Sequence, residues 1–575
     1  MATWTWRTWP DVLIDFGREA YVAWRLAEGD VLHRDVVYVS GPFSPYWNAL
    51  WFRTFGSGLD TLFAANALVL AALVLVWFHL LRRSADSTGA WVACAVFLSL
   101  FGFGQYVGIG NYNYIAPYSH ELPHGLLLSG LGFVFWDRVS RGGGLPWAMA
   151  AGLALGLVAL TKIEVFAAAA VANAVFLFGT LRRDRAEHAW VRSFAFAVGL
   201  VAPALLAVIA LATPLGLEGS LRAVGVGGLR LFGDDLATLP FYQRGLGVDD
   251  LAVNIGLALL WTVEIVFVFL PALAAALCLG APRFRRAWVP WLGGALMAAA
   301  IAPFDIAWLQ AARALPVFTM AGFAWALWRV VRGNPNEKPA TAVLQATLFA
   351  FATLMLAKIF FNARIYQYGF AHALPAALLL VTALVSWIPE EIEKRGGSGV
   401  VFRGAALGVV GLAVIAHLQI VAPHIAQKTS RLGGVDDAIR VHPGVARVLG
   451  AALEEVQART RPGDPLAVMP EGVMLNFMAR RPLPTPHFSF NPFEVLVYGE
   501  DAMVEAFASS PPAAVLLVHH DTSEHGARFL GRNYGIALLT WIRENYHTVR
   551  QIGGPPLEPG TRFGVQVLEA KRGVR

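Results

Sequence analysis

The sequence predicts an all-α membrane protein with about twelve transmembrane helices and a small α/β domain near the C-terminus. Hydrophobic residues make up 57% of the 575 positions and charged residues only 15%, whereas a soluble chain carries about a quarter charged residues. Apolar runs long enough to cross about 30 Å of hydrocarbon recur up to residue 422. Beyond residue 424 the composition becomes that of a soluble domain.

The opening 56 residues are amphipathic and rich in charge. The stretch "IDFGREAYVAWRLAEGD", residues 14–30, alternates acidic and basic side chains with large apolar ones. Asp15 precedes the helical pattern, so one interpretation is an interfacial helix that Asp15 caps at its N-terminus. No cleavable signal peptide is visible. Translocation of this segment without a preceding helix is unusual, so a missing first helix, and thirteen spans in total, is the alternative.

The expected spans follow from the apolar runs. Short loops rich in Lys or Arg, such as "LRRSAD", "DRVSRGGG" and "LRRDRAEH", all fall on one side if every run spans, and the positive-inside rule assigns that side to the cytoplasm. The opening segment and everything after Pro423 then lie outside the cytoplasm. The runs are 57–81, 90–107, 122–138, 146–161, 164–181, 190–214, 251–280, 287–303, 312–331, 341–361, 369–388 and 400–422.

The last 152 positions, 424–575, predict a small extracytoplasmic α/β domain. "PLAVMP" and "AAVLLVHH" resemble short buried strands, while "HPGVARVLGAALEEVQART" and "GIALLTWIRENY" have helical periodicity. The predicted division is therefore 1–56, 57–423 and 424–575. Cys94 and Cys278 lie in apolar runs, so no disulfide framework is expected. The net charge of +6 resides in the short loops, which argues against a nucleic-acid partner.

In two further stretches, ionisable residues are expected at the extracytoplasmic surface of the membrane. In "NYIAPYSHELPHG", Glu121 begins a helix, where an acidic side chain also compensates the helix dipole. In "ALTKIEVF", Lys162 and Glu164 point in different directions on a helix, so no internal ion pair is implied. A lysine that snorkels to the interface is the alternative for Lys162.

The stretch "FNARIYQYGFAHALPA" carries Arg364, Tyr366 and His372. Its tyrosines are typical of an aromatic belt, whereas the fork of Arg364 suits bidentate phosphate binding. His372 lies one turn into the membrane, which is costly without a partner. The loop from Gly216 to Asp250 is expected to be either a lid over a substrate cavity or a plain connector.

The stretch "DFGREAYVAWRLAEGDVLHRDVVYVSGPFSPYWNAL" resembles the first extracytoplasmic loop of the GT-C superfamily of glycosyltransferases. It is similar to bacterial relatives of protein O-mannosyltransferases and of the lipid A aminoarabinose transferase, which are like glycosyltransferase family 39. Asp15 matches the acidic position of that loop. The helix and the final "GP" are matched by Tyr21, Ala23, Gly29, Asp30, Gly41 and Pro42.

The resemblance implies a GT-C-like bundle and roles for further residues. Glu121 corresponds to a second acidic residue of the family, and "LTK" resembles its "TKG", although Ile163 and Glu164 depart from that pattern. "R.Y…ALP" resembles a basic residue followed by an aromatic one. The implied catalytic residues are Asp15 and Glu121, and the implied substrate-binding residues are Lys162, Arg364, Tyr366, His372 and, as a reserve carboxylate, Asp35.

The implied function is an inverting hexosyl or pentosyl transferase in the cell inner membrane. It would move a sugar from a polyprenyl-phosphate donor to an extracytoplasmic hydroxyl on a lipid, glycan or protein, with no cofactor and no metal. Its expected partners are that donor, membrane lipids and the acceptor. The alternative is a transporter or flippase for a lipid-linked sugar, which usually has repeated halves and mid-membrane ionisable groups. A non-catalytic scaffold would leave the one-sided charges without a purpose.

Overall fold

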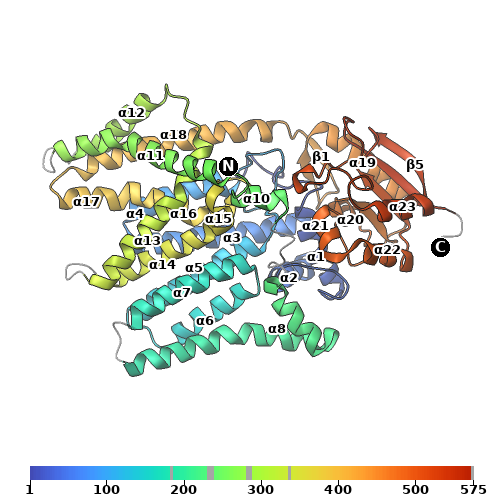
Figure 1. Ribbon diagram of the computed structural model, residues 1–575, viewed down its shortest axis with the longest axis horizontal. Coiled ribbons are helices and arrows are strands. Elements are labelled where there is room, and N and C mark those ends of the chain that lie inside the picture. Colours follow the sequence, from blue (N-terminus) through green and yellow to red (C-terminus); the bar gives the residue numbers. More distant parts are fainter. Residues whose placement is uncertain (182–185, 230–237, 280–287, 334–338, 572–575) are drawn as a thin grey trace.

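The structure is a computed structural model that describes residues 1–181, 186–229, 238–279, 288–333 and 339–571. A long bundle of helices occupies one side of the molecule and a compact domain with the strands occupies the other (Figure 1). The two N-terminal helices, α1 (Phe16–Glu28) and α2 (Phe43–Phe55), lie where the two parts meet. This junction positions the site described below.

The predicted amphipathic helix at the N-terminus is confirmed. It packs against other parts of the protein, and no side chain caps its N-terminus. Helix α1 begins directly after Asp15, but the Asp15 side chain makes no capping hydrogen bond. The apolar face of α1 packs against α2 and α20 (Val473–Ala479), so it buries Tyr21 and Trp24 in protein.

Each of the twelve apolar runs is helical in the part of the chain that the structure describes. Eight of these helical segments are long and apolar enough to cross a membrane, and three apolar helices are shorter. The chain is therefore a multi-pass membrane protein. The count of twelve or thirteen spans stays a prediction. The helices are α3 (Leu59–Ser84), α4 (Ser87–Val96) with η1 (Phe97–Gly102), α5 (Glu121–Ser140), α6 (Leu145–Ala159), α7 (Ile163–Leu181), α8 (Ala186–Leu229), α10 (Pro240–Leu246), α11 (Leu251–Cys278), α12 (Val289–Ile301), η3 (Trp308–Ala314), α13 (Leu315–Arg332), α14 (Pro339–Met355) with η4 (Leu356–Asn362), α15 (Gly369–His372), α16 (Leu374–Thr382), η5 (Ala383–Trp387), α17 (Ile388–Lys394) and α18 (Gly399–Ala426).

Contacts between loops show that the basic connections after α3, after α5 and before α18 share one end of the bundle. The predicted basic loops that include 182–185, 280–287 and 334–338 lie outside the described residues. Arg83 lies 3.6 Å from Asp137, across the α3 and α5 ends. Asp86 binds Arg403 at 2.8 Å and Ser386 at 2.7 Å. The start of α3 lies at the opposite end, where the Leu59 N–H donates to Asp437 of the C-terminal part. These three basic loops therefore lie at the end away from the C-terminal domain.

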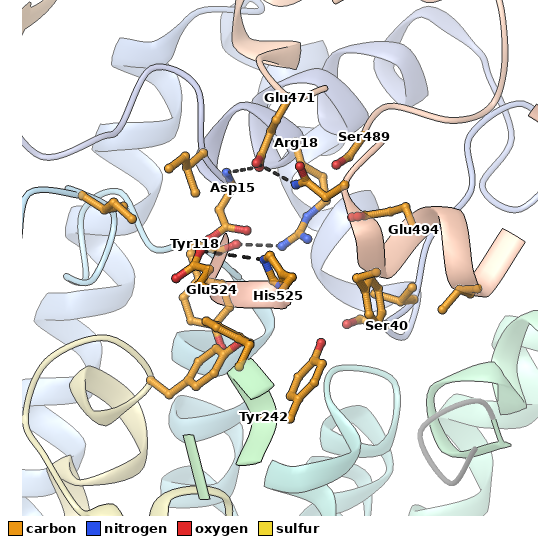
Figure 2. A pocket seen from close by; sticks show the side chains of 18 of the residues that line it. Asp15, Arg18, Ser40, Tyr118, Tyr242, Glu471, Ser489, Glu494, Glu524 and His525 are labelled. Carbon is orange, nitrogen blue, oxygen red and sulfur yellow. Dashed lines mark hydrogen bonds and ion pairs between the residues drawn. The ribbon is translucent and has the colours of Figure 1, made fainter. Parts of the chain in front are cut away.

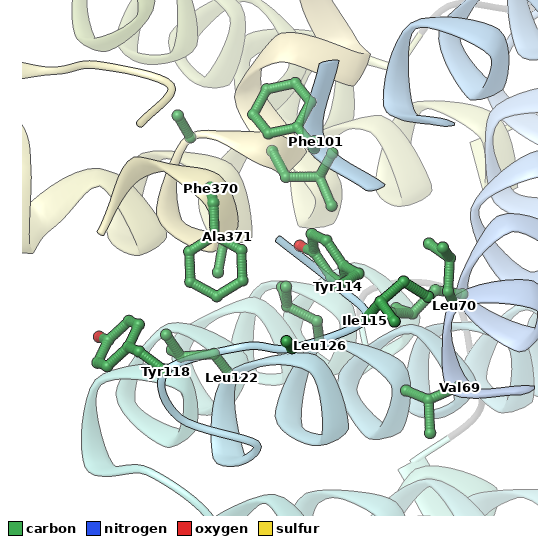
Figure 3. Close-up of a cluster of buried hydrophobic side chains, with 14 of the residues drawn as sticks. Val69, Leu70, Phe101, Tyr114, Ile115, Tyr118, Leu122, Leu126, Phe370 and Ala371 are labelled. Carbon is green, nitrogen blue, oxygen red and sulfur yellow. The ribbon is translucent and has the colours of Figure 1, made fainter. Parts of the chain in front are cut away.

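A buried loop, residues 103–120, connects η1 to α5 and reaches the site. The Asn113 carboxamide oxygen accepts the N–H groups of Ile115 and Ala116, which fixes a turn without regular secondary structure. Tyr114 and Ile115 pack among side chains of α3, η1, α5 and α15 (Figure 3). This packing fixes Tyr118, near the end of the loop, beside the start of α5.

The C-terminal part contains a four-stranded sheet with the order β3-β4-β6-β5. Strand β3 (Leu466–Met469) runs parallel to β4 (Ala514–Val518), and β6 (Gly564–Ala570) pairs antiparallel with β4 and β5 (Tyr546–Gly553). The predicted strands "LAVM" and "AVLLV" are fully buried, as expected. The remaining elements are β1 (Ser430–Leu432), β2 (Ile439–Val441), α19 (Pro443–Arg459), α21 (Pro492–Tyr498), α22 (Glu500–Ser509), η6 (Ser523–His525) and α23 (Ile536–Asn545).

Candidate active site

A cavity of about 200 Å³ lies where the opening segment, the helix bundle and the C-terminal domain meet. Figure 2 shows Asp15, Arg18 and Glu471 close together at one end of this cavity and Tyr242 at the other. Ionisable side chains from all three parts of the chain line it, so the cavity exists only in the folded protein. They are Asp15, Arg18, Tyr112, Tyr118, Lys162, Glu164, Tyr242, Lys358, Tyr368, Glu471, Glu494, His520, Glu524 and His525.

Asp15 is held in a strained turn. Its backbone has φ 58° and ψ −64°, and the Phe16 N–H donates to the Ile14 carbonyl at 2.7 Å, which closes a γ-turn centred on Asp15. This conformation is rare and costs energy for a residue with a side chain. Its N–H donates to Glu471 Oε1 at 3.0 Å. Strained residues of this kind cluster at functional sites, which favours a functional Asp15 over a simple helix cap.

Three carboxyl groups around the cavity titrate near neutral pH. Burial, together with the neighbouring Glu471, raises the pKa of Asp15 to about 7. Burial also raises the pKa of Glu471 to about 7 and, with repulsion from Glu471, that of Glu494 to about 8. A carboxylate with such a pKa is a competent general base at physiological pH.

These raised pKa values predict that stability falls as the pH rises. The folded-state pKa values lie above the unfolded ones, which are 3.8 for Asp and 4.5 for Glu. The stabilisation is therefore complete below about pH 4 and is lost as the pH passes through 7 to 8. We expect the melting temperature of the purified protein to be lower at pH 9 than at pH 6, and Glu494→Gln to reduce that difference.

The matched control for this titration is Glu505→Gln, because Glu505 is exposed on α22 in the same domain. It should leave the pH dependence of the melting temperature unchanged. A melting temperature that rises from pH 6 to pH 9 would contradict the expectation.

Arg18 is held beside Asp15, one turn into α1. Its Nε and Nη2 donate to Glu19 Oε1 at 3.1 and 3.0 Å, and Nη2 also donates to the Tyr118 carbonyl at 2.7 Å. Burial alone raises the pKa of Glu19, but Arg18 and His120 outweigh burial and bring it to about 2. Glu19 therefore stays ionised and holds the guanidinium at the cavity wall.

Two lysines contribute further positive charge. Lys162 Nζ donates to Ser119 Oγ at 3.2 Å and lies 5.0 Å from the centre of the Tyr118 ring. Lys358 Nζ, on η4, forms an ion pair with Glu164 Oε1, on α7, at 2.7 Å. Both lysines line the cavity. With Arg18 they give the cavity three cationic groups.

Glu121 begins α5, as predicted, but does not line the cavity. It is fully buried, and its carboxylate accepts hydrogen bonds from the Tyr38 hydroxyl at 2.5 Å and from Ser119 Oγ at 2.6 Å. Ser119 in turn accepts from Lys162. Glu121 was expected to contact a substrate directly. In the structure it lies outside the cavity and supports Lys162 through Ser119.

Arg364 does not reach the cavity, contrary to the sequence-based expectation. It is only 7% exposed, and its Nη1 donates to the Gly245 and Asn362 carbonyls at 3.3 and 3.2 Å. The chain turns sharply between η4 and α15, so the guanidinium fastens α10 to η4. Lys358, six residues earlier and within η4, lines the cavity instead.

The other three expected substrate-binding residues also lie outside the cavity. His372 is fully buried, and its Nδ1 lies 2.7 Å from the Met355 carbonyl oxygen, which supplies the partner that an intramembrane histidine requires. Tyr366 lies beside Arg364, 5.9 Å from its guanidinium carbon. Asp35 accepts the Val31 N–H at 2.8 Å and pairs with Arg34 on the surface.

Most cavity residues that the sequence analysis did not select stand in no local pattern that indicates a functional site. Lys358 is the exception, because a lysine inside the apolar run 341–361 already indicates a functional or paired group. Glu471 and Glu494 lie in a domain that only tertiary packing brings against the opening segment and the helix bundle. From the loop 216–250, Phe241 and Tyr242 line the cavity, while its residues 230–237 lie outside the described part of the chain.

Buried polar atoms around the cavity are unpartnered within the described residues. Such atoms are rare in folded proteins and point to a ligand or ordered water. Ser489 and Asn491, 5% and 8% exposed, each have an oxygen without a hydrogen bond. The set that lines the cavity is Tyr118 Oη, Glu164 Oε2, Ser489 Oγ, Asn491 Oδ1, Glu494 Oε2 and His525 Nδ1. His520 Nδ1 also has no hydrogen bond, but it lies 3.6 Å from Glu471 Oε2.

No group of three or more His, Cys, Asp or Glu side chains in the described ranges has the geometry to hold a metal ion. That a metal is unnecessary remains a prediction.

No protein-family model matches this chain, and no curated protein matches it. Among solved structures, the oligosaccharyltransferase of Archaeoglobus fulgidus in complex with Zn and sulfate is similar at 16% identity and a TM-score of 0.47, over 97% of this chain and 70% of that one. ArnT from Cupriavidus metallidurans bound to undecaprenyl phosphate is similar at 15% identity and a TM-score of 0.42, over 98% and 96%. These similarities concern the course of the chain only.

Proposed function

We propose that this chain is an inverting glycosyltransferase of the membrane, which moves a sugar from a polyprenyl-phosphate donor to an acceptor hydroxyl outside the cytoplasm. The observation that carries this proposal is the shared cavity of Asp15 with Arg18, Lys162 and Lys358. A base and a phosphate-binding group in one partly apolar cavity are what the reaction needs. Asp15 is the catalytic base, and the sugar is a hexose or a pentose.

The proposed step is a single displacement at the anomeric carbon. The acceptor oxygen forms a bond to C1 while the bond from C1 to the phosphate oxygen breaks, and the acceptor proton passes to the Asp15 carboxylate. Because the nucleophile attacks opposite the leaving group, the configuration at C1 inverts. Negative charge builds on the leaving phosphate, and cations placed where charge develops stabilise the transition state. Lys162, Lys358 and Arg18 supply that stabilisation.

The membrane placement follows from the same proposal. The donor lipid reaches the cavity from the bilayer, and the acceptor reaches it from the side of the C-terminal domain. The positive-inside rule puts the basic loops in the cytoplasm, so the cavity and the α/β domain face outward from the inner membrane.

The test is turnover of a lipid-linked donor by the purified protein in liposomes. Polyprenyl-phosphate sugars with a labelled sugar, offered with mixed envelope acceptors, should release polyprenyl phosphate and yield a labelled product of inverted configuration. Liposomes without protein are the control. Movement of the intact donor across the bilayer without cleavage would instead support the flippase alternative and overturn the proposal.

A further inference from the structure

We propose that Glu471, in the C-terminal domain, is a positioning residue that holds Asp15 in its strained turn and sets the protonation of its carboxylate. This inference rests on the proposed function, because it assigns a task to the domain that the transfer reaction itself leaves unexplained. It makes the α/β domain part of the catalytic apparatus.

The two oxygens of Glu471 hold two separate segments. Oε1 accepts the Asp15 N–H at 3.0 Å, and Oε2 accepts Asn491 Nδ2 at 2.8 Å. Glu471 itself is 8% exposed and follows strand β3, at the edge of a buried sheet. A buried carboxylate on a rigid strand end is a fixed point, so it defines where the Asp15 backbone lies.

The domain is docked closely enough for this role. A Cβ added at Gly17 would come within 2.5 Å of the Met474 backbone nitrogen, so α1 and α20 approach at a distance that only glycine allows. The Leu483 N–H donates to the Tyr21 hydroxyl at 2.8 Å, and the Val37 N–H donates to the Pro486 carbonyl at 3.1 Å. These contacts fix the opening segment to the domain directly after Asp15, from Gly17 to Val37.

Glu471 also acts on Asp15 through its charge. Repulsion between the two buried carboxylates contributes, after burial, to the raised pKa of Asp15. The N-terminal segment adds Asp11, Arg18 and Glu19 around the pair. The C-terminal domain adds Glu494, His520 and Tyr534, and the helical part adds Lys162, Tyr112, Tyr242 and Tyr368. Among these, Glu471 is the group that touches the Asp15 backbone.

The test compares Glu471→Ala with Glu471→Gln in the full chain. The alanine variant releases the turn, and we expect kcat to fall about 100-fold while the KM for the lipid donor changes by less than about threefold. The glutamine variant keeps an oxygen for the Asp15 N–H, and the Asn491 carboxamide can rotate to accept from the new amide group. It should therefore recover most of kcat at pH 9 and move the acid limb of the pH–kcat profile about one unit lower.

The controls separate this inference from the proposed function. Glu505→Gln, exposed on α22, should match the native profile, and Asn491→Ala, which removes the second contact of Glu471, should lower kcat about fivefold. If both Glu471 variants keep the native kcat and pH profile while Asp15→Asn is inactive, the positioning role is wrong and the transferase proposal stands. If Glu471→Ala does not fold, an unmoved acid limb in Glu471→Gln overturns the positioning role.

Discussion

Asp15→Asn is expected to lower kcat for sugar transfer by about 10³-fold. General bases contribute about 10² to 10⁴ in rate, and an amide cannot accept the acceptor proton. Asn also tolerates positive φ better than most residues, so the γ-turn and its N–H bond to Glu471 should persist. The KM for the donor should therefore change little. Release of polyprenyl phosphate at saturating donor measures the effect.

The matched control is Asp35→Asn, because the sequence offers Asp35 as the reserve carboxylate while the structure places it on the surface. We expect this variant to keep kcat within about twofold of the native value. Equal turnover by Asp15→Asn and the native protein would remove Asp15 from the mechanism. Loss of turnover in Asp35→Asn alone would transfer the role of base to Asp35.

Lys358→Met is expected to destabilise the protein by about 3 kcal/mol. Removal of one partner of a largely buried ion pair leaves the other charge without its closest partner. Glu164 and Lys358 are each 22% exposed and meet at 2.7 Å, and Glu164 Oε2 already has no other partner in the described chain. The free energy of unfolding, measured with denaturant in detergent, should therefore fall sharply in the single variant.

The double variant Glu164→Gln with Lys358→Met separates stability from chemistry. Neutralising both partners should restore most of the lost free energy of unfolding, because no unpaired charge remains. Turnover should stay at least about 30-fold below native, since removing a charged hydrogen bond to the leaving phosphate costs about 2 kcal/mol. Recovery of both stability and turnover would show that Lys358 only balances Glu164, and would remove it from the phosphate site.

The sequence predicted the helical elements well. Apolar runs of membrane length are helices in the described part of the chain, because the lipid requires every backbone group to be satisfied within the segment. The strands 466–469 and 514–518 follow from short apolar runs between polar segments. Asp15 and Lys162, singled out from local stretches, do line the same cavity.

Five of the seven candidate side chains do not line the cavity. Arg364 follows one apolar run and His372 lies one turn into the next, yet Arg364 donates to the Gly245 carbonyl and His372 lies against the Met355 carbonyl. The position of a residue along an apolar run indicates its depth in the membrane. The neighbour it meets depends on the rotation of each helix, which a run of similar apolar residues leaves undefined.

The sequence by itself determined that this chain crosses the membrane and that an acidic residue precedes an amphipathic helix. Only the tertiary structure decided that Glu471, more than 450 residues further along, holds that acid, and that Lys358 pairs with Glu164. Hydrophobic periodicity is a local property of the chain, whereas the partners of a buried charge are chosen by packing between distant segments. For that reason the elements could be read from the sequence and the assembled cavity could not.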